Sequence, residues 1–357
     1  MQIHEYIDKM KKIHQNLLEY LEDGSKEEEY QNLLTLIDEN HIRDLNSELK
    51  NFLHLIVSIS NDHYRTPDFF GKIEQLILQF KDEISQNFTN FQIFKIFKRN
   101  KRILLFLIEQ KLFEFNESIA QLVKQKESDN FIKYFYPELK DFIQIQNKEI
   151  ESFEEKRKEG ENDDNEIFKL IRNDLIEEFI IYINKNNFSL SKPIEPSIFE
   201  THTSLLDKNI TFAKYAAFFG SFQIFKYLYF NHFYQMNTNI WIYAIHGQNQ
   251  EIFQFLIDKK ITPQESGYEN CVIESIKCHH VDVTNYLINN YVQFNIEKEE
   301  KIVSSILKYR NYSYFPDQLN DNVFFYLCKY CYFNLVDIIL KKKDIDVNKI
   351  IATETII

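Results

Sequence analysis

The chain has 357 residues, 44% of them hydrophobic, which is enough apolar material for two or three globular units or for one elongated array of repeats. Its formal net charge of −12 argues against the broad basic surface that gives nucleic-acid-binding proteins most of their affinity. Six glycines and six prolines are too few for the frequent turns of a β-sandwich or barrel, so the composition favours an all-α protein.

The sequence shows no pattern typical of export or of membrane insertion. Residues 1–10 are polar and amphipathic, and no charged region leads into an apolar one. The longest apolar runs, such as residues 103–108, are much shorter than the roughly 18 to 20 residues that cross a bilayer. We therefore expect a cytoplasmic protein with reduced cysteines, no membrane contact and no cofactor.

Apolar residues recur at intervals of three and four through the first part of the chain, which is the spacing of amphipathic helices. This spacing predicts helices at about residues 1–22, 30–39, 45–60 and 69–84, and two short helices on either side of the basic residues 98–102. Together they predict an N-terminal α-helical domain at residues 1–147, built of degenerate helix pairs.

A strongly charged stretch follows at residues 148–166, where only Ile150 and Phe153 could be buried. It is predicted to be an acidic linker, or a solvated helix end that frays at Gly160. We expect a repeat array at residues 167–357 behind this boundary. Its clear units are predicted at about residues 205–235, 236–263, 267–295 and 320–348.

Residues 211–259 contain one pattern twice, TFAKYAAFFGSFQIFKYLYF and NIWIYAIHGQNQEIFQFLID. Each copy predicts a short helix rich in small residues, a tight break and a second apolar helix. Aligning the first helices gives four copies, anchored at Ala216, Ala244, Ser275 and Leu327. Five positions before these anchors are residues suited to cap a starting helix: Thr211, Asn239, Asn270 and Asn322.

Each copy continues with an apolar stripe that predicts the buried side of the second helix. The stripes are Ile224, Phe225 and Leu228; Ile252, Phe253 and Leu256; Val283, Thr284 and Leu287; and Leu335, Val336 and Ile339. The gap before the last copy has room for one degenerate unit near residues 302–314, which Pro316 would cut short. Ser221 and Asn249 occupy one position between the helices, and Asn100 and His280 match it. We therefore expect His280 to make a turn hydrogen bond.

A unit of about 33 residues with two short antiparallel helices and a turn resembles the ankyrin repeat. Five residues match the ankyrin consensus: Thr211, Ala216, Ala217, Gly220 and Leu228. Residues 344–348, Asp-Ile-Asp-Val-Asn, look like the finger sequence that closes such a repeat. The consensus opening Thr-Pro-Leu-His is replaced by Thr-Phe-Ala-Lys at residues 211–214, so the helix-opening proline and the histidine hydrogen bonds of the family are missing.

Six segments extend the resemblance over nearly the whole chain: FLHLIVSISNDHYRTPDFF, FKRNKRILLFLIE, RNDLIEEFIIYINKNN, YAAFFGSFQIFKYL, WIYAIHGQNQEI and IKCHH. They resemble the large trichomonad family of ankyrin-repeat proteins that carry an uncharacterised domain. The resemblance implies an ankyrin-like solenoid of helical hairpins and a binding role, and it supplies no catalytic residues.

The resulting functional hypothesis is a non-enzymatic scaffold or adaptor that binds a protein partner, without a small-molecule substrate. In a stack of repeats, each unit buries its apolar faces against its neighbours and leaves a concave face and turns for binding. The finger segments at residues 231–238, 259–267 and 290–297 should carry the contacts. The predicted partner-binding residues are His232, Tyr234, Gln235, Lys260, Thr262, Gln264, Gln293 and Asn295. A single exposed aromatic residue counts for little in a chain with 33 Phe and 21 Tyr.

The first alternative is a metal-binding or enzymatic protein that uses the cysteines and histidines of the last quarter. Cys328 and Cys331 have the spacing of half a zinc site or of a redox pair, and residues 278–280, Cys-His-His, could add ligands. A zinc site needs two such pairs in a defined geometry, so we expect the cysteines to pack as small buried residues.

The second alternative is nucleic-acid binding through residues 98–102, Lys-Arg-Asn-Lys-Arg, with Phe91, Phe94 and Phe97 close by. The helical spacing of the phenylalanines favours a buried face beside a solvated turn. Asp62 and His63 are expected to be polar loop residues, because no nucleophile in a known motif accompanies them. We find no phosphate-binding or dinucleotide glycine motif and no His-Glu-x-x-His.

The end of the chain gives one further expectation. After residues 344–348 the chain ends at Ile357, where the first helix of another unit would begin. Because solenoids end in a polar cap, we expect Leu335, Ile338 and Ile339 to form an uncovered apolar edge. Such an edge would mean a truncated product or an array completed by another chain, including self-association.

Overall fold

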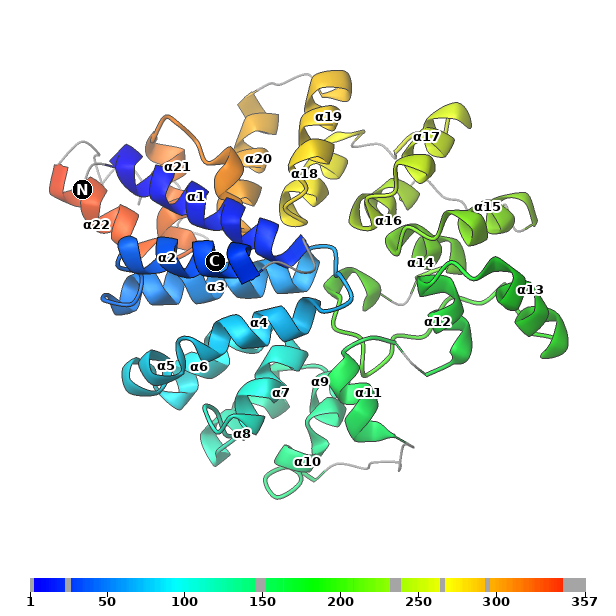
Figure 1. The fold of residues 1–357 in the computed structure, drawn as a ribbon, viewed down its shortest axis with the longest axis horizontal. Helices are drawn as coiled ribbons and strands as arrows, with labels where there is room; N and C mark the ends of the chain where they lie inside the picture. The colour runs from blue at the N-terminus through cyan, green and yellow to red at the C-terminus, as the bar shows by residue number, and fades with distance from the viewer. Residues whose placement is uncertain are drawn as a thin grey trace. The chain divides into compact units, whose positions relative to one another are not determined.

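The computed structural model describes residues 3–22, 27–144, 152–162, 164–207, 209–231, 239–263, 267–292 and 296–342. Within these ranges the chain forms 22 α-helices, and short 3-10 helices include η1 (Thr203–Leu205) and η3 (Tyr312–Tyr314) (Figure 1). An isolated antiparallel bridge joins Ile194 to Ile210. The prediction of an all-α protein is confirmed.

The chain folds into two compact units. The first unit comprises Met1–Ile59, Arg65–Leu76 and Tyr268–Ile357, and the second comprises Ser60–Tyr64 and Ile77–Gly267. The division falls inside two helices, α3 (Asn46–Asp62) and α4 (Phe69–Leu78). These units are built from discontinuous segments, whereas the expected domains were two consecutive stretches separated by a linker at residues 148–166. The expected domain boundary stays a prediction.

Apart from its parts of α3 and α4, the first unit contains helices from both ends of the chain. They are α1 (Ile3–Glu22), α2 (Glu27–Glu39), α18 (Glu269–Lys277), α19 (Val281–Tyr291), α20 (Ile296–Lys308), α21 (Asp321–Lys329) and α22 (Phe333–Lys342). Helix α1 shows why they assemble, since its apolar face, including Met10, Ile13 and Leu17, is fully buried. Each such side chain contributes roughly 1.5–3 kcal/mol to folding.

The second unit contains the middle of the chain. Its helices are α5 (Lys81–Asn87), α6 (Asn90–Phe97), α7 (Lys101–Glu109), α8 (Glu117–Lys126), α9 (Asp129–Tyr134), α10 (Tyr136–Leu139), α11 (Phe153–Glu159), α12 (Glu166–Arg172), α13 (Ile176–Lys185), α14 (Phe212–Phe218), α15 (Phe222–Asn231), α16 (Ile240–Gly247) and α17 (Gln250–Asp258). Helix α11 lies inside the predicted linker, packs against α7, and buries Arg157, which pairs with Glu138 at 2.8 Å. The expectation that only Ile150 and Phe153 could be buried there is wrong for Arg157, while Ile150 lies outside the described residues.

Three successive helix pairs of the second unit pack in sequence: α12 with α13, α14 with α15, and α16 with α17. Among the first helices of the pairs, α14 contacts both α12 and α16. Among the second helices, α15 contacts both α13 and α17 (Figure 1). The apolar stripes cause this arrangement, because Ile224, Phe225 and Leu228 of α15 are fully buried. Each pair therefore completes its core only with its neighbours.

The helix starts agree with the predicted caps only in part. Thr211 caps α14, since its hydroxyl accepts the Lys214 N–H at 3.2 Å. Asn239 is the residue before α16, but its side chain makes no capping hydrogen bond. Asn270 and Asn322 lie inside helices that begin earlier, so their prediction as caps is wrong. The extended backbone of Asn320 places its side chain on the Val323 N–H, and this residue caps α21 instead.

The break between the two helices of a pair has the same backbone form in both units. One residue adopts a left-handed conformation, with φ between 49° and 69°, at Asp174, Gly220, Gln248, His279, Arg310 and Cys331. In most of these breaks the next N–H reaches back to the carbonyl five residues earlier, as from Ser221 to Ala216 at 2.9 Å and from Tyr332 to Leu327 at 2.9 Å. This is the Schellman ending of a helix.

At several of these turns, the side chain of the residue after the left-handed one links the turn to a neighbouring turn. Ser221 Oγ donates to the Ile171 carbonyl at 2.5 Å, and Asn249 Nδ2 donates to the Gly220 carbonyl at 2.7 Å. In the first unit, Asn311 Nδ2 donates to the Ile276 carbonyl at 2.9 Å. Asn100 follows no left-handed residue, but its Nδ2 likewise donates to a carbonyl, that of Ser60, at 3.3 Å. These side chains satisfy buried carbonyls that would otherwise be costly.

The region near residues 302–314, where a degenerate unit was expected, contains the second part of a helix and a short 3-10 turn. Helix α20 ends at Lys308, Arg310 is left-handed, and η3 takes the place of a second helix before Pro316. The expectation of an uncovered apolar edge is wrong for Leu335 and Ile339, which are 0% and 3% exposed. Helix α22 packs against both α21 and α1, so the N-terminal helix helps to cover this edge.

Candidate binding surface

The structure describes two of the eight predicted partner-binding residues. Lys260 and Thr262 follow α17, and both are exposed. Lys260 is left-handed, with φ 54°, and its N–H donates to the Ile257 carbonyl at 2.9 Å. The others, His232, Tyr234, Gln235, Gln264, Gln293 and Asn295, lie outside the described residues, as does the sequence 344–348.

A group of aromatic rings lies at the ends of α15 and α17, next to two of the predicted finger segments. Tyr229, Phe230, Phe255 and Lys259 make up what we call the aromatic–lysine surface. The ring centroids of Tyr229 and Phe255 are 4.8 Å apart, and those of Tyr229 and Phe230 are 5.1 Å apart. The two helices, which belong to neighbouring pairs, pack against each other within the second unit, and this packing brings the rings together.

Lys259 lies against all three rings. Its Nζ is 5.8 Å from the centroid of Tyr229 and 5.6 Å from those of Phe230 and Phe255. An ammonium group over an exposed ring contributes roughly 0.5–1 kcal/mol. The lysine covers the rings incompletely, because Phe230 remains 61% exposed. A large apolar side chain therefore stays in water beside the Lys259 ammonium group.

Sequence reasoning missed this surface. Phe230 falls outside the buried stripe of its helix, which was a usable signal, but one exposed ring is expected by chance in so aromatic a chain. The meaningful feature is that rings from two helices meet. Aromatic side chains grouped in this way are enriched in protein interfaces, where burying one contributes about 1.5–3 kcal/mol.

The basic residues 98–102 contact other parts of the second unit. Lys98 pairs with Glu127, and Arg102 donates to the Lys158 carbonyl. Lys101 is only 7% exposed, and its Nζ donates to the Ile198 carbonyl at 2.6 Å. Burial lowers the pKa of Lys101 to about 8, and the nearby Glu200 opposes this shift.

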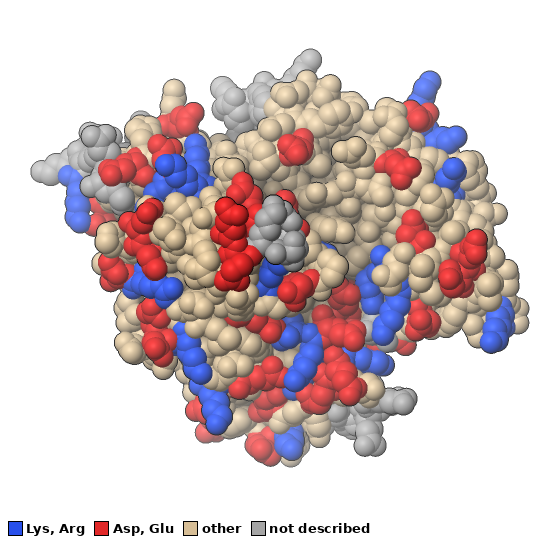
Figure 2. All heavy atoms as spheres, in the orientation of Figure 1, with Lys and Arg blue, Asp and Glu red and all other residues tan. Residues whose placement is uncertain are grey.

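The phenylalanines beside this cluster are mostly unavailable for stacking on bases. Phe94 and Phe97 are fully buried, as their helical spacing predicted, and Phe91 is 48% exposed beneath the Lys95 ammonium. Figure 2 shows Lys and Arg side chains interspersed with Asp and Glu side chains on the face in view. The described residues at this turn thus give the nucleic-acid alternative little support.

The four cysteines fall into two classes. Cys271 and Cys278 are buried, and burial raises the pKa of Cys271 to about 12. Cys328 and Cys331 are exposed, so the expectation that they pack as buried residues is wrong for this pair. The reason is local, because α21 buries Val323, Phe324 and Leu327 and turns its other side to solvent.

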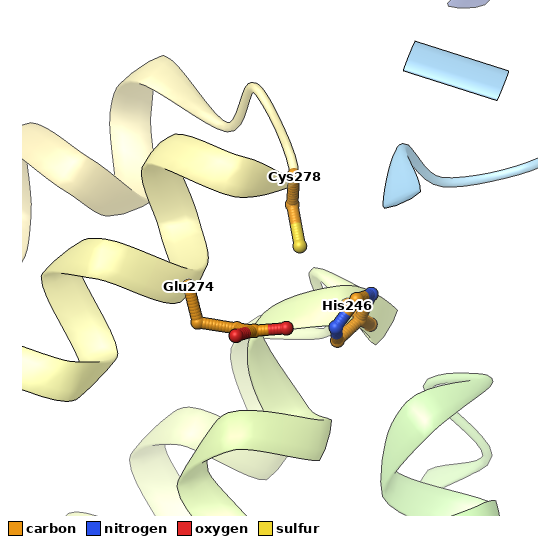
Figure 3. Close-up of side chains that lie close together, drawn as sticks. All are labelled: His246, Glu274 and Cys278. Carbon is orange, nitrogen blue, oxygen red and sulfur yellow. The ribbon is translucent and has the colours of Figure 1, made fainter. Parts of the chain in front are cut away.

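Possible metal ligands of the last quarter have other contacts. Glu274 and Cys278 lie one turn apart at the end of α18 (Figure 3), and Glu274 pairs with Lys277 at 3.0 Å. His246, labelled in the same view, belongs to the second unit, where it hydrogen bonds with Ser204 at 3.2 Å. Within either unit taken alone, the described residues place no three His, Cys, Asp or Glu ligand atoms within 4.8 Å of one another.

Two buried histidines meet in the first unit. His14 Nε2 and His279 Nδ1 share a hydrogen bond of 2.9 Å, although the residues are 265 positions apart. Neither side chain was expected to contact the other, since local spacing contains no signal for so distant a pair.

Asp62 and His63, in the second unit, are also buried, and Asp62 accepts a hydrogen bond from Thr203 at 2.7 Å. The expectation of a loop position is wrong for Asp62, which is the last residue of α3, whereas His63 follows the helix.

Comparisons with family models, with curated proteins and with solved structures found no match for this sequence. Among the described residues, no helix combines the length and the apolar character that a membrane span requires. The functional argument therefore depends on the residues and contacts above.

Proposed function

We propose that this chain is a non-enzymatic scaffold that binds a protein partner through an ankyrin-like array of helix pairs. The observation that carries the proposal is the aromatic–lysine surface at the ends of α15 and α17, next to the finger segments. It offers a partner a broad apolar contact, because Phe230 is 61% exposed and neighbours two further rings.

The stacking of α12 to α17 supports an ankyrin-like interpretation. Successive pairs pack first helix on first helix and second helix on second helix, as repeat arrays do. Such arrays expose the segments that follow their second helices, and Lys260 and Thr262 are exposed there. The likeness of residues 211–228 to the ankyrin consensus, and of the wider chain to the trichomonad ankyrin-repeat family, supports the same proposal.

Affinity isolation with a substitution at Phe230 tests the proposal. Tagged wild-type protein and the Phe230→Ala variant would capture proteins from a native lysate, and bound proteins would be quantified by mass spectrometry. We expect at least one partner to decrease about tenfold, the effect of losing roughly 1.4 kcal/mol of binding free energy. Circular dichroism should show unchanged helical content, because the removed ring is largely solvated.

Ile181→Ala is the matched control. Ile181 is 63% exposed on α13, in the same unit, but lies outside the aromatic–lysine surface. It should retain the partner at the wild-type level. Equal capture by wild type and Phe230→Ala would contradict a role for this surface, and equal loss in both variants would indicate a nonspecific effect of exposed apolar area.

A triple substitution, His232→Ala with Tyr234→Ala and Gln235→Ala, tests the finger segment itself. If the finger segment contributes, capture of the same partner should weaken further while helical content stays constant. Unchanged capture would confine binding to the aromatic–lysine surface or move it elsewhere.

A further inference from the structure

Cys328 and Cys331 form an exposed pair at the turn between α21 and α22. Cys328 is in the last turn of α21, and Cys331 is the left-handed residue of the break, with φ 61°. The Cys331 N–H donates to the Cys328 carbonyl at 3.1 Å, so a backbone hydrogen bond closes the turn. Both side chains are exposed, unlike those of Cys271 and Cys278.

The turn geometry suits a disulfide between the two residues. A four-residue turn keeps its first and last Cα atoms within about 7 Å, and disulfides join Cα atoms about 4.4–6.8 Å apart. The hydrogen bond between Cys331 and Cys328 already holds the backbone in this form. The turn therefore holds the two Cα atoms at a separation that a disulfide can span.

A metal site at this pair is less well supported. Structural zinc takes four ligands, and two thiolates supply only half of them. Among the described residues of the first unit, no third Cys, His, Asp or Glu atom completes a compact ligand group with these thiols. The chemistry that two adjacent exposed thiols can perform alone is their joint oxidation.

We propose that Cys328 and Cys331 are a redox modification site, oxidised reversibly to a disulfide by a low-molecular-weight disulfide such as oxidised glutathione. The Cys331 thiolate attacks one sulfur of the oxidant, forms a mixed disulfide and releases one glutathione thiolate. The Cys328 thiolate then attacks the Cys331 sulfur and releases the second. The two cysteines lose two electrons and two protons, and one oxidised glutathione becomes two reduced molecules.

The order of attack follows from the surroundings of the two thiols. Partial burial, together with the neighbouring Cys331, raises the pKa of Cys328, which lowers the fraction of this thiol present as thiolate. Cys331 is exposed on the turn itself and is assigned the first attack. In a reducing compartment such a pair senses the redox state and is not a permanent crosslink.

Residues within the turn contact the preceding helix, so oxidation would have a structural effect. Arg310 donates to the Tyr330 carbonyl at 3.0 Å, and the Tyr330 hydroxyl bonds with Ser304 of α20 at 3.1 Å. The Tyr332 hydroxyl donates to the Leu307 carbonyl at 2.9 Å. A disulfide around Tyr330 would therefore restrain the segment that joins α21 and α22 to α20.

The sequence provides a direct test, because Lys329 lies between the two cysteines. The full chain would be equilibrated with oxidised glutathione, blocked with N-ethylmaleimide in denaturant and digested with trypsin, which cleaves after Lys329. A disulfide keeps the two resulting peptides joined, and a reductant separates them. We expect the joined species to be the main product and to disappear in excess reduced glutathione.

Cys328→Ser and Cys331→Ser are matched controls, since both positions are exposed and tolerate a hydroxyl. Each variant should give only a mixed disulfide with glutathione. Free thiols at both positions of the wild type, or two separate glutathione adducts, would overturn the proposal. Hydrogen exchange in residues 321–342 should slow on oxidation in the wild type alone, and equal exchange in both states would contradict the structural effect.

Discussion

The turn between α14 and α15 and the turn between α21 and α22 have nearly the same backbone and different chemistry. Gly220 and Cys331 are both left-handed, with φ of 69° and 61°, and the residue after each makes the same hydrogen bond back into the first helix. A Cβ atom at Gly220 would lie 2.8 Å from the Gly247 carbonyl oxygen, whereas Cys331 is exposed. The two turns thus share one backbone form, and what packs against the left-handed residue decides which side chain fits there.

The largest effect is expected for Gly220→Ala. A left-handed alanine costs about 1–2 kcal/mol, and the contact with the Gly247 carbonyl adds about 1–3 kcal/mol. We expect the free energy of unfolding in urea to fall by about 2–5 kcal/mol. Gly267→Ala is the control, since Gly267 has φ 58° but nothing within 4 Å of the added atom, and it should lose only the left-handed cost of about 1–2 kcal/mol. Equal losses would refute the packing argument.

A pH-dependent effect of about 2–3 kcal/mol is expected at another turn of the second unit, where Lys101 follows Asn100. Burial lowers the pKa of Lys101 in the folded state to about 8, while the unfolded chain titrates near 10.4. Between these values the unfolded chain binds more protons, so raising the pH favours folding.

Paired urea titrations at pH 7.5 and pH 10 of the wild type and Lys101→Met isolate this contribution. The stability of the wild type relative to the variant should rise by about 2–3 kcal/mol between the two pH values. Because the tyrosines are present in both proteins, their titration cancels. Lys95→Met, at an exposed residue, should follow the wild type at both pH values. A constant difference between wild type and Lys101→Met would show that the lysine is not buried in its neutral form.

A smaller loss is expected for Asn249→Ala, which removes the link between two turns. Asn249 accepts the Glu251 and Ile252 N–H groups at 2.8 and 3.3 Å and donates to the Gly220 carbonyl. The variant loses the helix cap and leaves the part-buried Gly220 carbonyl without this hydrogen bond, so its free energy of unfolding should fall by about 2 kcal/mol. Thermal or urea unfolding measures this loss. Asn231→Ala removes only a local hydrogen bond to Tyr227 and should change stability by less than about 0.5 kcal/mol.

The smallest change in the free energy of unfolding is expected for Cys331→Gly, and it is a gain. Relief of the left-handed strain of about 1–2 kcal/mol exceeds the added flexibility of the unfolded glycine chain, about 0.5–1 kcal/mol. The variant should therefore gain about 0.5–1 kcal/mol of stability under reducing conditions. A clear loss would mean that the Cys331 side chain packs in a way its exposure does not suggest.

The spacing of residues along the sequence was enough to predict many of the helices and their buried faces, but little of the surface. The buried stripe at Ile224, Phe225 and Leu228 could be predicted, because it depends on spacing along one helix. The alignment placed Asn249 between its two helices, but its bond to the Gly220 carbonyl depends on how neighbouring pairs stack. The prediction of Asn270 and Asn322 as helix caps was wrong, because the position at which a helix starts depends on the backbone angles of the residues before it. The surface around Phe230 was missed because it requires two helices to bring their rings together. The contact of α1 with α22 could not be predicted from periodicity at all.

The contacts of α1 with α22 and with the segments around His279 and Ser313 have a consequence for the order of folding during synthesis. The hydrogen bond between His14 and His279 and the contact of His14 with Ser313 span 265 and 299 positions. A ribosome makes α1 well before the helices that complete its surroundings, because more than 260 residues separate His14 from His279 and Ser313. Such distant closures are slow, and the waiting apolar surface is prone to aggregation. Helix α1 is thus the part of the chain whose protection by a chaperone would matter longest.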